Sequence, residues 1–339
     1  MTVSRVPEGP APLAVRATGW QFPETVRDTA RLPELSDLTP AERGVLAGLG
    51  IEHIRADDVP DAAALATGAA QRALATAGLT AAEVRALVVV ESRAPQTLLS
   101  SEATRIQELL GARDAVTFSV GGLGCVSIAP ALLTARGLLA ADPDLGHVLV
   151  AHGSTPATPG RYRHPVTVNG DGGGALLLSR TGPVRVLDSV QETDGRYWNL
   201  FEVAFRDVPS AQWRERCQEP AVYSFQLAVQ TRNRLTTLLD KLLARHGMTR
   251  TDVAGYLTQN LSVGSFGFTE ESLGITVLPA CRDNLREYGH LGPNDVFFNL
   301  YTALERKELG EGDRAVLINV SPVAAWSVLL VEIGAEPVR

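Results

Sequence analysis

A glycine-rich turn between a strand-like and a helix-like segment constrains this chain more than any other feature. The turn is Gly121–Ser127, and its sequence is Gly-Gly-Leu-Gly-Cys-Val-Ser. Ala115–Ser119 alternates before it and is rich in β-branched and aromatic residues, which predicts a short buried strand. Val126–Ala141 after it is almost wholly apolar or small, which predicts a helix buried on all sides. The glycines allow the backbone to bend sharply between strand and helix.

Cys125 therefore falls at the first turn of the predicted buried helix. Unpaired backbone N–H groups and the helix dipole favour a thiolate there, so Cys125 is a candidate nucleophile. Free cysteines are also often small, inert core residues, and the turn alone leaves that alternative open. Cys217 and Cys281 lie far from Cys125 and form no CxxC pair, which indicates neither a disulfide framework nor a zinc site.

Composition and charge exclude several classes of protein. The 339 residues are 45% apolar and 20% charged, enough for two packed globular halves. A net charge of −7 without a long basic run argues against nucleic acid or an anionic membrane as partner. The first residues lack the apolar run of a signal peptide. We also expect no apolar stretch to reach the roughly 18 residues of a spanning helix. The sequence thus predicts a soluble, cytoplasmic protein.

Strand and helix patterns alternate along the chain and begin again near residue 184. In the second part, Ser224–His246 predicts a long amphipathic helix and Gly255–Thr258 a strand. A further helix is expected from Val296 to Leu309. Two similar α/β halves, residues 1–183 and 184–339, are the predicted domain organisation.

Several segments together resemble the type III ketoacyl-ACP synthases of the thiolase fold, over nearly the whole chain. They are Gly50–Arg55, Phe118–Ser127, Asn169–Ala175, Tyr288–His290 and the last hairpin. The resemblance implies a five-layered α/β/α/β/α fold with two pseudo-symmetric halves, and a homodimer. It also implies an acyltransferase of the EC 2.3.1 type that works through a cysteine thioester. Such an enzyme needs no cofactor and takes acyl-ACP or acyl-CoA as its substrate.

The chain departs from this family at two functional positions. A His-Gln-Ala-Asn segment supplies the catalytic histidine of the condensing enzymes, whereas this chain has Gln259–Ser262. Neither amide in that segment can act as a base or carry a proton at neutral pH. The family's catalytic asparagine follows a Tyr-Gly pair, and His290 occupies that position here. This pattern resembles a divergent branch found beside antibiotic pathways, which uses Cys or Ser with His and Asp for acyl transfer without condensation.

Asp295 is the expected partner of His290, five residues further along the chain. The intervening turn can fold its carboxylate back toward the imidazole, which would fix the tautomer and stabilise imidazolium. The alternative is an acidic residue at the N-terminus of the next helix, and both roles are compatible. The predicted catalytic residues are therefore Cys125, His290 and Asp295, with no metal.

The substrate-binding residues are predicted from the same resemblance. Gln259 and Asn260 are expected to contact substrate. The backbone amides of Cys125 and Val323 are expected to form the oxyanion hole. The other histidines have no paired ligand spacing, so core or surface roles are expected for them. They are His53, His147, His152, His164 and His246.

These features predict a ping-pong acyltransferase of secondary metabolism. Cys125 would take an acyl group from an acyl carrier protein or coenzyme A thioester. It would pass the group to a hydroxyl of a sugar or polyketide, or to a second carrier thiol, without decarboxylation. Two alternatives stay open: a starter-unit ketoacyl synthase that still makes a carbon–carbon bond, and a non-catalytic partner subunit that shapes an acyl tunnel.

Overall fold

The computed structural model describes residues 11–58 and 61–335, and within them one mixed sheet dominates. This sheet has nine strands in the order β13-β14-β15-β10-β1-β9-β6-β4-β5. Its two middle strands, β1 (Ala14–Gln21) and β10 (Val184–Thr193), pair at two positions. The sheet therefore has two halves that meet at a narrow antiparallel seam.

Each half of the sheet mixes parallel and antiparallel pairs. In the first half β4 pairs in parallel with β5 and β6, and in the second half β13 pairs in parallel with β14. The strands beside the seam, β9 and β15, run antiparallel to their neighbours. The remaining strands of the sheet are β4 (Ala86–Val90), β5 (Val116–Val120), β6 (Val148–Ser154), β9 (Gly172–Ser179), β13 (Gly255–Thr258), β14 (Arg314–Ser321) and β15 (Ala325–Ile333).

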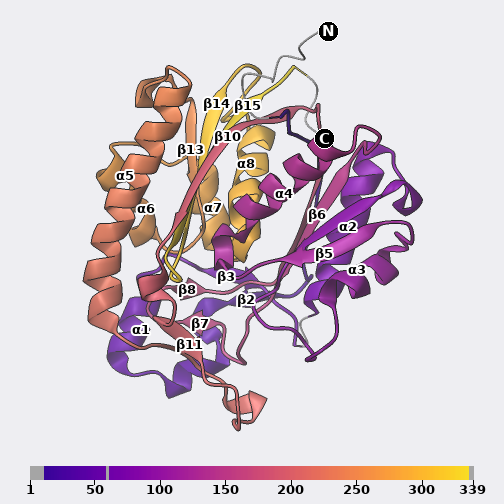
Figure 1. The fold of residues 1–339 in the computed structure, drawn as a ribbon. Helices are drawn as coiled ribbons and strands as arrows, with labels where there is room; N and C mark the ends of the chain where they lie inside the picture. The colour runs from indigo at the N-terminus through magenta and orange to yellow at the C-terminus, as the bar shows by residue number, and fades with distance from the viewer. Residues whose placement is uncertain (1–10, 59–60, 336–339) are drawn as a thin grey trace, which may run out of the picture.

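Helices cover both faces of both half-sheets, which gives five layers (Figure 1). α2 and α3 lie outside the first half, α5 lies outside the second half with α6 against it, and α4 and α8 lie between the halves. The α-helices are α1 (Pro40–Ala47), α2 (Ala62–Ala77), α3 (Glu102–Leu110), α4 (Ile128–Ala141), α5 (Ala228–Arg245), α6 (Val263–Leu273), α7 (Pro279–Tyr288) and α8 (Asp295–Glu305).

The apolar side chains follow this layering. One core cluster fills the space between the half-sheets and includes Leu132 of α4 and Phe297 of α8. A second lies under α2 and α3, and a third lies under α5. Burial of apolar surface on both faces of each half-sheet is the main stabilising contribution of such an arrangement.

The alanine-rich helix α2 packs unusually close to the sheet. A Cβ at Gly153 would lie 1.9 Å from the carbonyl oxygen of Ala62, and one at Gly173 would lie 2.0 Å from that of Leu65. Only glycine fits at such distances, so these two strand positions allow the helix to rest on the sheet. The glycine-rich entry to β9 is therefore a packing feature.

Three expectations about helices need correction. The helix expected over Ser224–His246 is α-helical from Ala228 to Arg245, after a π-helical segment at Val222–Leu227. The helix expected to end at Leu309 ends at Glu305.

The third correction concerns the segment Gly124–Ala141, which is long and apolar enough to cross a membrane by length and composition. Our expectation that no stretch reaches this length is therefore wrong. In this structure 56% of the segment is buried inside the protein, between the two half-sheets. Its one charged side chain, Arg136, donates a hydrogen bond to the carbonyl of Val186 in β10. The apolar character therefore matches a central core helix.

The division into residues 1–183 and 184–339 stays a prediction. The seam between β1 and β10 is the structural feature nearest to that boundary, because β10 begins at Val184.

Candidate active site

Cys125 lies where the polypeptide passes from β5 into the central helix. It belongs to a 3-10 turn, Gly124–Ser127, that runs directly into α4, so it precedes the α-helix by one short turn. Gly122 and Gly124 have φ of 84° and 55°, a left-handed conformation that favours glycine. The glycines predicted to bend the chain thus hold Cys125 between the end of β5 and the start of α4.

His290 is held by its backbone. Gly289 ends α7 with φ of 62°, and a Cβ there would lie 2.7 Å from the carbonyl oxygen of Val168. The His290 N–H donates to that same carbonyl at 2.9 Å, and the Gly170 N–H donates to the His290 carbonyl at 3.2 Å. The segment that precedes β9 therefore fixes where the imidazole can lie.

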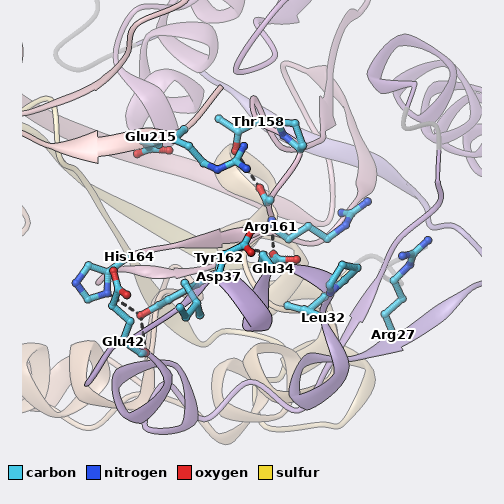
Figure 2. Close-up of a pocket in the computed structure, with 15 residues that line it drawn as sticks. Arg27, Leu32, Glu34, Asp37, Glu42, Thr158, Arg161, Tyr162, His164 and Glu215 are labelled. Carbon is cyan, nitrogen blue, oxygen red and sulfur yellow. Dashed lines mark hydrogen bonds between the residues drawn. The ribbon is translucent and has the colours of Figure 1, made fainter. Parts of the chain in front are cut away.

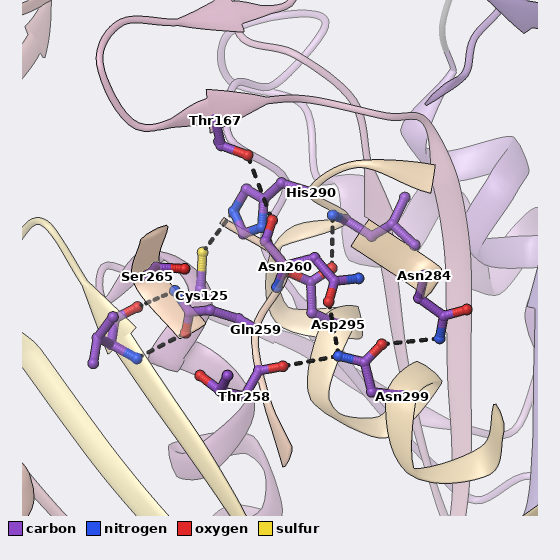
Figure 3. Close-up of polar contacts among 12 residues, drawn as sticks. Cys125, Thr167, Thr258, Gln259, Asn260, Ser265, Asn284, His290, Asp295 and Asn299 are labelled. Carbon is purple, nitrogen blue, oxygen red and sulfur yellow. Dashed lines mark hydrogen bonds and ion pairs between the residues drawn. The ribbon is translucent and has the colours of Figure 1, made fainter. Parts of the chain in front are cut away.

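Cys125, His290 and Asp295 form one hydrogen-bonded line (Figure 3). Cys125 Sγ lies 3.1 Å from His290 Nε2, and His290 Nδ1 lies 2.6 Å from Asp295 Oδ2. Cys125 is 6% exposed, and the other two side chains are fully buried. The structure thus brings together all three residues predicted as catalytic.

The Asp295 carboxylate also accepts two backbone hydrogen bonds. The N–H of Asn260 donates to Oδ2 and that of Leu291 to Oδ1, both at 2.8 Å. These donors lie outside α8, and the N-cap of that helix is Asn294. Asp295 therefore begins α8, as expected, but its carboxylate binds the imidazole and two loop amides instead of capping the helix.

Electrostatics favour a thiolate–imidazolium pair. Burial raises the pKa of the Cys125 thiol, but the charge and hydrogen bond of His290 outweigh it, with help from Arg93, and hold the pKa below its usual value. Burial lowers the pKa of His290, but the charges and hydrogen bonds of Cys125 and Asp295 outweigh it, so the net pKa is raised. Both shifts favour the charged pair, in which the sulfur is a thiolate, the nucleophilic form of cysteine.

The other two cysteines have the opposite electrostatics. Burial raises the pKa of the Cys281 thiol to about 12, and it also raises that of Cys217. Both thiols are therefore protonated and unreactive near neutral pH.

A layer of buried amides supports Asp295 and its neighbours (Figure 3). Asn299 Nδ2 donates to the Thr258 carbonyl and to Asn260 Oδ1, both at 2.8 Å, and Asn284 Nδ2 donates to Asn299 Oδ1 at 2.9 Å. Asn260 is fully buried in this layer, and its N–H reaches Asp295. Its contact with substrate stays a prediction.

Gln259 holds a strand end in place. Its Nε2 donates to the Val320 carbonyl, and its Oε1 accepts from the Val320 N–H, both at 2.7 Å. The side chain is 1% exposed. Both ends of the amide are therefore already used by the end of β14, which leaves little for a substrate, and its predicted role stays untested.

Two cavities lie at the site. One, of about 380 Å³, is lined by Cys125 and by Val323, whose turn joins β14 to β15. The other, of about 270 Å³, has mainly apolar walls and contains Gln259. The two share Ser321 and Pro322. The structure thus places Val323 beside Cys125, while its role in an oxyanion hole stays a prediction.

A larger cavity lies apart from Cys125. It measures about 480 Å³ and is lined by residues of the segment before α1 and of β7 (Tyr162–Arg163) (Figure 2). Its polar groups bind one another: the half-buried Glu34 accepts from the N–H groups of Arg161 and Tyr162, at 2.7 and 3.1 Å. Size alone therefore does not identify the reactive site.

Four residues in the wall of the Cys125 cavity were not anticipated: Arg93, His152, Arg163 and Glu215. Arg163 and Glu215 form a two-pronged ion pair, in which Arg163 Nε donates to Glu215 Oε2 at 2.6 Å. Burial lowers the pKa of His152 to about 4, so this histidine is neutral. No local pattern distinguishes these residues, because they come from four separate segments.

Glu52, His53 and Glu287 form the one group among the described residues that could hold a metal ion by proximity. Their ligand atoms lie within 4.8 Å of one another, at the surface. Glu287 also pairs with Arg286. The group has the character of a surface ion-pair cluster, since exposed acidic groups commonly gather without a metal.

No protein-family model matches the chain. The β-ketoacyl-[acyl-carrier-protein] synthase III of Rhodobacter capsulatus is 29% identical over 326 residues, which cover 93% of this chain and 98% of that protein. The enzyme of the same name from Sphingopyxis alaskensis is 31% identical over 199 residues, 56% of this chain and 59% of that protein.

Solved structures agree in fold. ChlB3, an acyltransferase, superimposes with a TM-score of 0.78 at 21% identity, over 95% of this chain and 98% of its own. The 3-oxoacyl-(acyl carrier protein) synthase III of Pseudomonas aeruginosa PAO1 superimposes with a TM-score of 0.78 at 21% identity, over 96% of this chain and 99% of its own. Cerulenin-bound OleA of Xanthomonas campestris superimposes with a TM-score of 0.78 at 19% identity, over 96% of this chain and 100% of its own. The expected α/β thiolase fold is therefore confirmed, and the sequence similarity is to proteins named β-ketoacyl-[acyl-carrier-protein] synthase III.

Proposed function

We propose that this chain is an acyltransferase that carries an acyl group on Cys125 and passes it to an acceptor without decarboxylative condensation. The observation that carries the proposal is the buried line from Cys125 through His290 to Asp295, with distances of 3.1 and 2.6 Å. Such a line supplies a nucleophile, a base and an orienting carboxylate in sequence.

The first half-reaction loads the enzyme. The Cys125 thiolate attacks the carbonyl carbon of a thioester donor, and a new C–S bond forms. The bond to the donor sulfur then breaks, and the departing thiolate takes the proton from His290 Nε2, so it leaves as a thiol. The product is acyl-Cys125 with a neutral imidazole.

The second half-reaction uses that imidazole as a base. Asp295 accepts a hydrogen bond from the Nδ1–H group of His290, which keeps that proton on Nδ1 and leaves the lone pair on Nε2 directed toward Cys125. The acceptor loses its proton to Nε2 as its oxygen or sulfur attacks the acyl carbon. The C–S bond to Cys125 breaks, and the thiolate–imidazolium pair is restored.

Gln259 argues against a condensing reaction. The family's condensing enzymes place a histidine there, whereas this glutamine binds the Val320 backbone with both ends of its amide. It cannot donate or accept a proton in a decarboxylation. The reading as a non-catalytic subunit is disfavoured because only Cys125, of the three cysteines, has a lowered pKa.

The partners follow from the same reasoning. The curated relatives are named for an acyl carrier protein, so an acyl-ACP, or a coenzyme A thioester, is the proposed donor. The two cavities that share Ser321 and Pro322 offer separate room for donor and acceptor. A hydroxyl on a sugar or polyketide is the proposed acceptor, with a carrier thiol as the alternative. We extend the proposal to a cytoplasmic homodimer in an antibiotic pathway.

The test is intact-mass detection of an acyl adduct after incubation with acyl thioesters. Wild type should gain one acyl mass, and Cys125→Ala should gain none. Cys217→Ala is the matched control and should behave as wild type, because burial raises the pKa of that thiol. An adduct of normal yield on Cys125→Ala would refute the covalent mechanism.

His290 is tested by the second half-reaction. His290→Ala should slow transfer to an acceptor by roughly 10²–10⁴-fold, the usual contribution of a general base. Loading should suffer less, because Arg93 and the helix start still favour the thiolate, so acyl-enzyme should accumulate. Transfer at the wild-type rate would exclude His290 as the base.

A further inference from the structure

The wall of the Cys125 cavity contains Arg93, whose two terminal nitrogens have no hydrogen-bond partner among the described residues. The Arg93 side chain is partly exposed overall, but its Nη1 and Nη2 atoms are enclosed. No described residue accepts a hydrogen bond from either nitrogen. Burial lowers the pKa of Arg93 to about 10, so the guanidinium is still charged at neutral pH. An enclosed cation without a partner is costly, so its presence indicates that something else binds there.

Polar groups with free capacity gather around this guanidinium. A Cβ at Gly292 would lie 3.4 Å from His152 Nε2, 3.6 Å from Arg93 Nη2 and 3.7 Å from Ser154 Oγ. Ser154 Oγ is also enclosed and has no partner among the described residues. His152 Nδ1 is satisfied by the Val90 carbonyl, and this histidine is neutral. The positive charge of the group therefore belongs to Arg93.

The charges across the cavity do not cancel this cation. Arg163 and Glu215 neutralise each other in their ion pair. Glu91 also lines the cavity but is exposed, so solvent screens it. The Cys125 thiolate does attract Arg93 in the free enzyme. That negative charge disappears when the sulfur becomes a thioester. Asp295 still attracts Arg93 electrostatically, but its carboxylate is hydrogen-bonded to His290, Asn260 and Leu291. Nη1 and Nη2 of Arg93 therefore remain without an acceptor among the described residues.

We infer that the acyl group carried by Cys125 ends in a carboxylate, which Arg93 binds; the donor is thus the half-thioester of a dicarboxylic acid. This inference rests on the proposed function and specifies its substrate class. The planar guanidinium presents two N–H donors in the geometry of a carboxylate, which a neutral acyl chain cannot use. A straight alkyl chain would instead leave Nη1 and Nη2 unpaired beside it.

The experiment compares donors of equal chain length that differ in the terminal group. Succinyl- and glutaryl-pantetheine are set against butyryl- and valeryl-pantetheine, and kcat/KM for loading of Cys125 is measured by intact mass. Wild type should prefer the better dicarboxylic donor by about 10–100-fold, the factor expected for a charged hydrogen-bonded pair.

Variants of Arg93 separate substrate binding from a general effect on the thiolate. Arg93→Met should abolish the preference by slowing loading from the dicarboxylic donors more than from the neutral donors, because the loss of its help to the thiolate slows both donor types alike. Arg93→Lys should retain part of it, because an ammonium keeps the charge but loses the two-pronged geometry. Arg214→Met, at an exposed arginine, is the matched control and should leave the preference intact.

Each other outcome overturns the inference. If Arg93→Met slows both donor types by the same factor and raises the pH needed for alkylation of Cys125 by iodoacetamide, Arg93 serves only the thiolate. If wild type loads the neutral donors equally well, the carboxylate site is refuted while the acyltransferase proposal stands. This wild-type comparison decides the matter even if Arg93→Met fails to fold. If no thioester loads Cys125, the proposed function fails, and this inference fails with it.

Discussion

Replacement of Asp295 by asparagine tests how the structure supports His290. The carboxylate accepts three hydrogen bonds, from His290 Nδ1 at 2.6 Å and from the N–H groups of Asn260 and Leu291 at 2.8 Å each. An asparagine has only one acceptor oxygen, so its NH₂ group must face at least one of these donors. Asp295→Asn therefore changes the site by more than one charge.

The structure sets the expected magnitudes. If the amide oxygen stays with Leu291, the NH₂ group faces the Asn260 N–H, and a buried donor without a partner costs about 1–3 kcal/mol. His290 Nδ1 must then accept a hydrogen bond, which moves the ring proton to Nε2, the nitrogen that should act as base. We expect transfer to fall by roughly 10²–10⁴-fold, as for loss of a general base.

The assay combines denaturant unfolding with loading and transfer rates by intact mass. Asp313→Asn is the matched control, because its carboxylate also accepts a backbone N–H, from Gly310 at 2.8 Å, but in a surface turn. The control should keep wild-type transfer. If Asp295→Asn retains near-normal transfer and unchanged stability, our reasoning about the tautomer is refuted, and the catalytic unit shrinks to Cys125 and His290.

Three further predictions follow from individual contacts. Alkylation of Cys125 by iodoacetamide should stay fast at pH values below the usual thiol pKa of about 8.5, because the pKa of Cys125 is lowered and the thiolate persists down to that lower value. His290→Ala should move the midpoint of the pH profile of alkylation to higher pH, and an unchanged midpoint would contradict the ion pair. Gln259→His should release no carbon dioxide from malonyl-ACP, since His290 occupies the place of the partner asparagine; rapid release in a decarboxylation assay would show the site to be a condensing one. Asp171→Ala should lower the free energy of unfolding by about 3–5 kcal/mol, because it leaves the buried Arg161 unpaired; an unchanged denaturant midpoint would exclude this role.

Local sequence signals determined many of the elements around the site. α2 begins after Asp61, whose side chain caps it, and ends at Gly78, which is left-handed; both are signals that a sequence carries locally. The strand expected at Gly255–Thr258 is β13, with the same bounds. Such features depend on caps, glycines and side-chain periodicity over a few residues, so a sequence carries them directly.

Elements without a strong local signal were missed. Neither α6 nor α7 was anticipated, and residues 224–227, expected to be ordinary helix, belong to the π-helical segment Val222–Leu227. Their conformations depend on contacts with distant segments, which the local pattern does not contain.

The sequence by itself determined the fold class, the turn that carries Cys125 and the candidacy of His290 and Asp295. Only the tertiary structure decided that Cys125 and His290, 165 residues apart, lie 3.1 Å from one another. It also decided that Gln259 binds a strand end. In the described part of the chain it further leaves Nη1 and Nη2 of Arg93, in the wall of the Cys125 cavity, without a hydrogen-bond partner. The physical reason is that local propensity acts over one or two turns of chain, whereas these distances and unpaired groups exist only once the two half-sheets pack around α4 and α8.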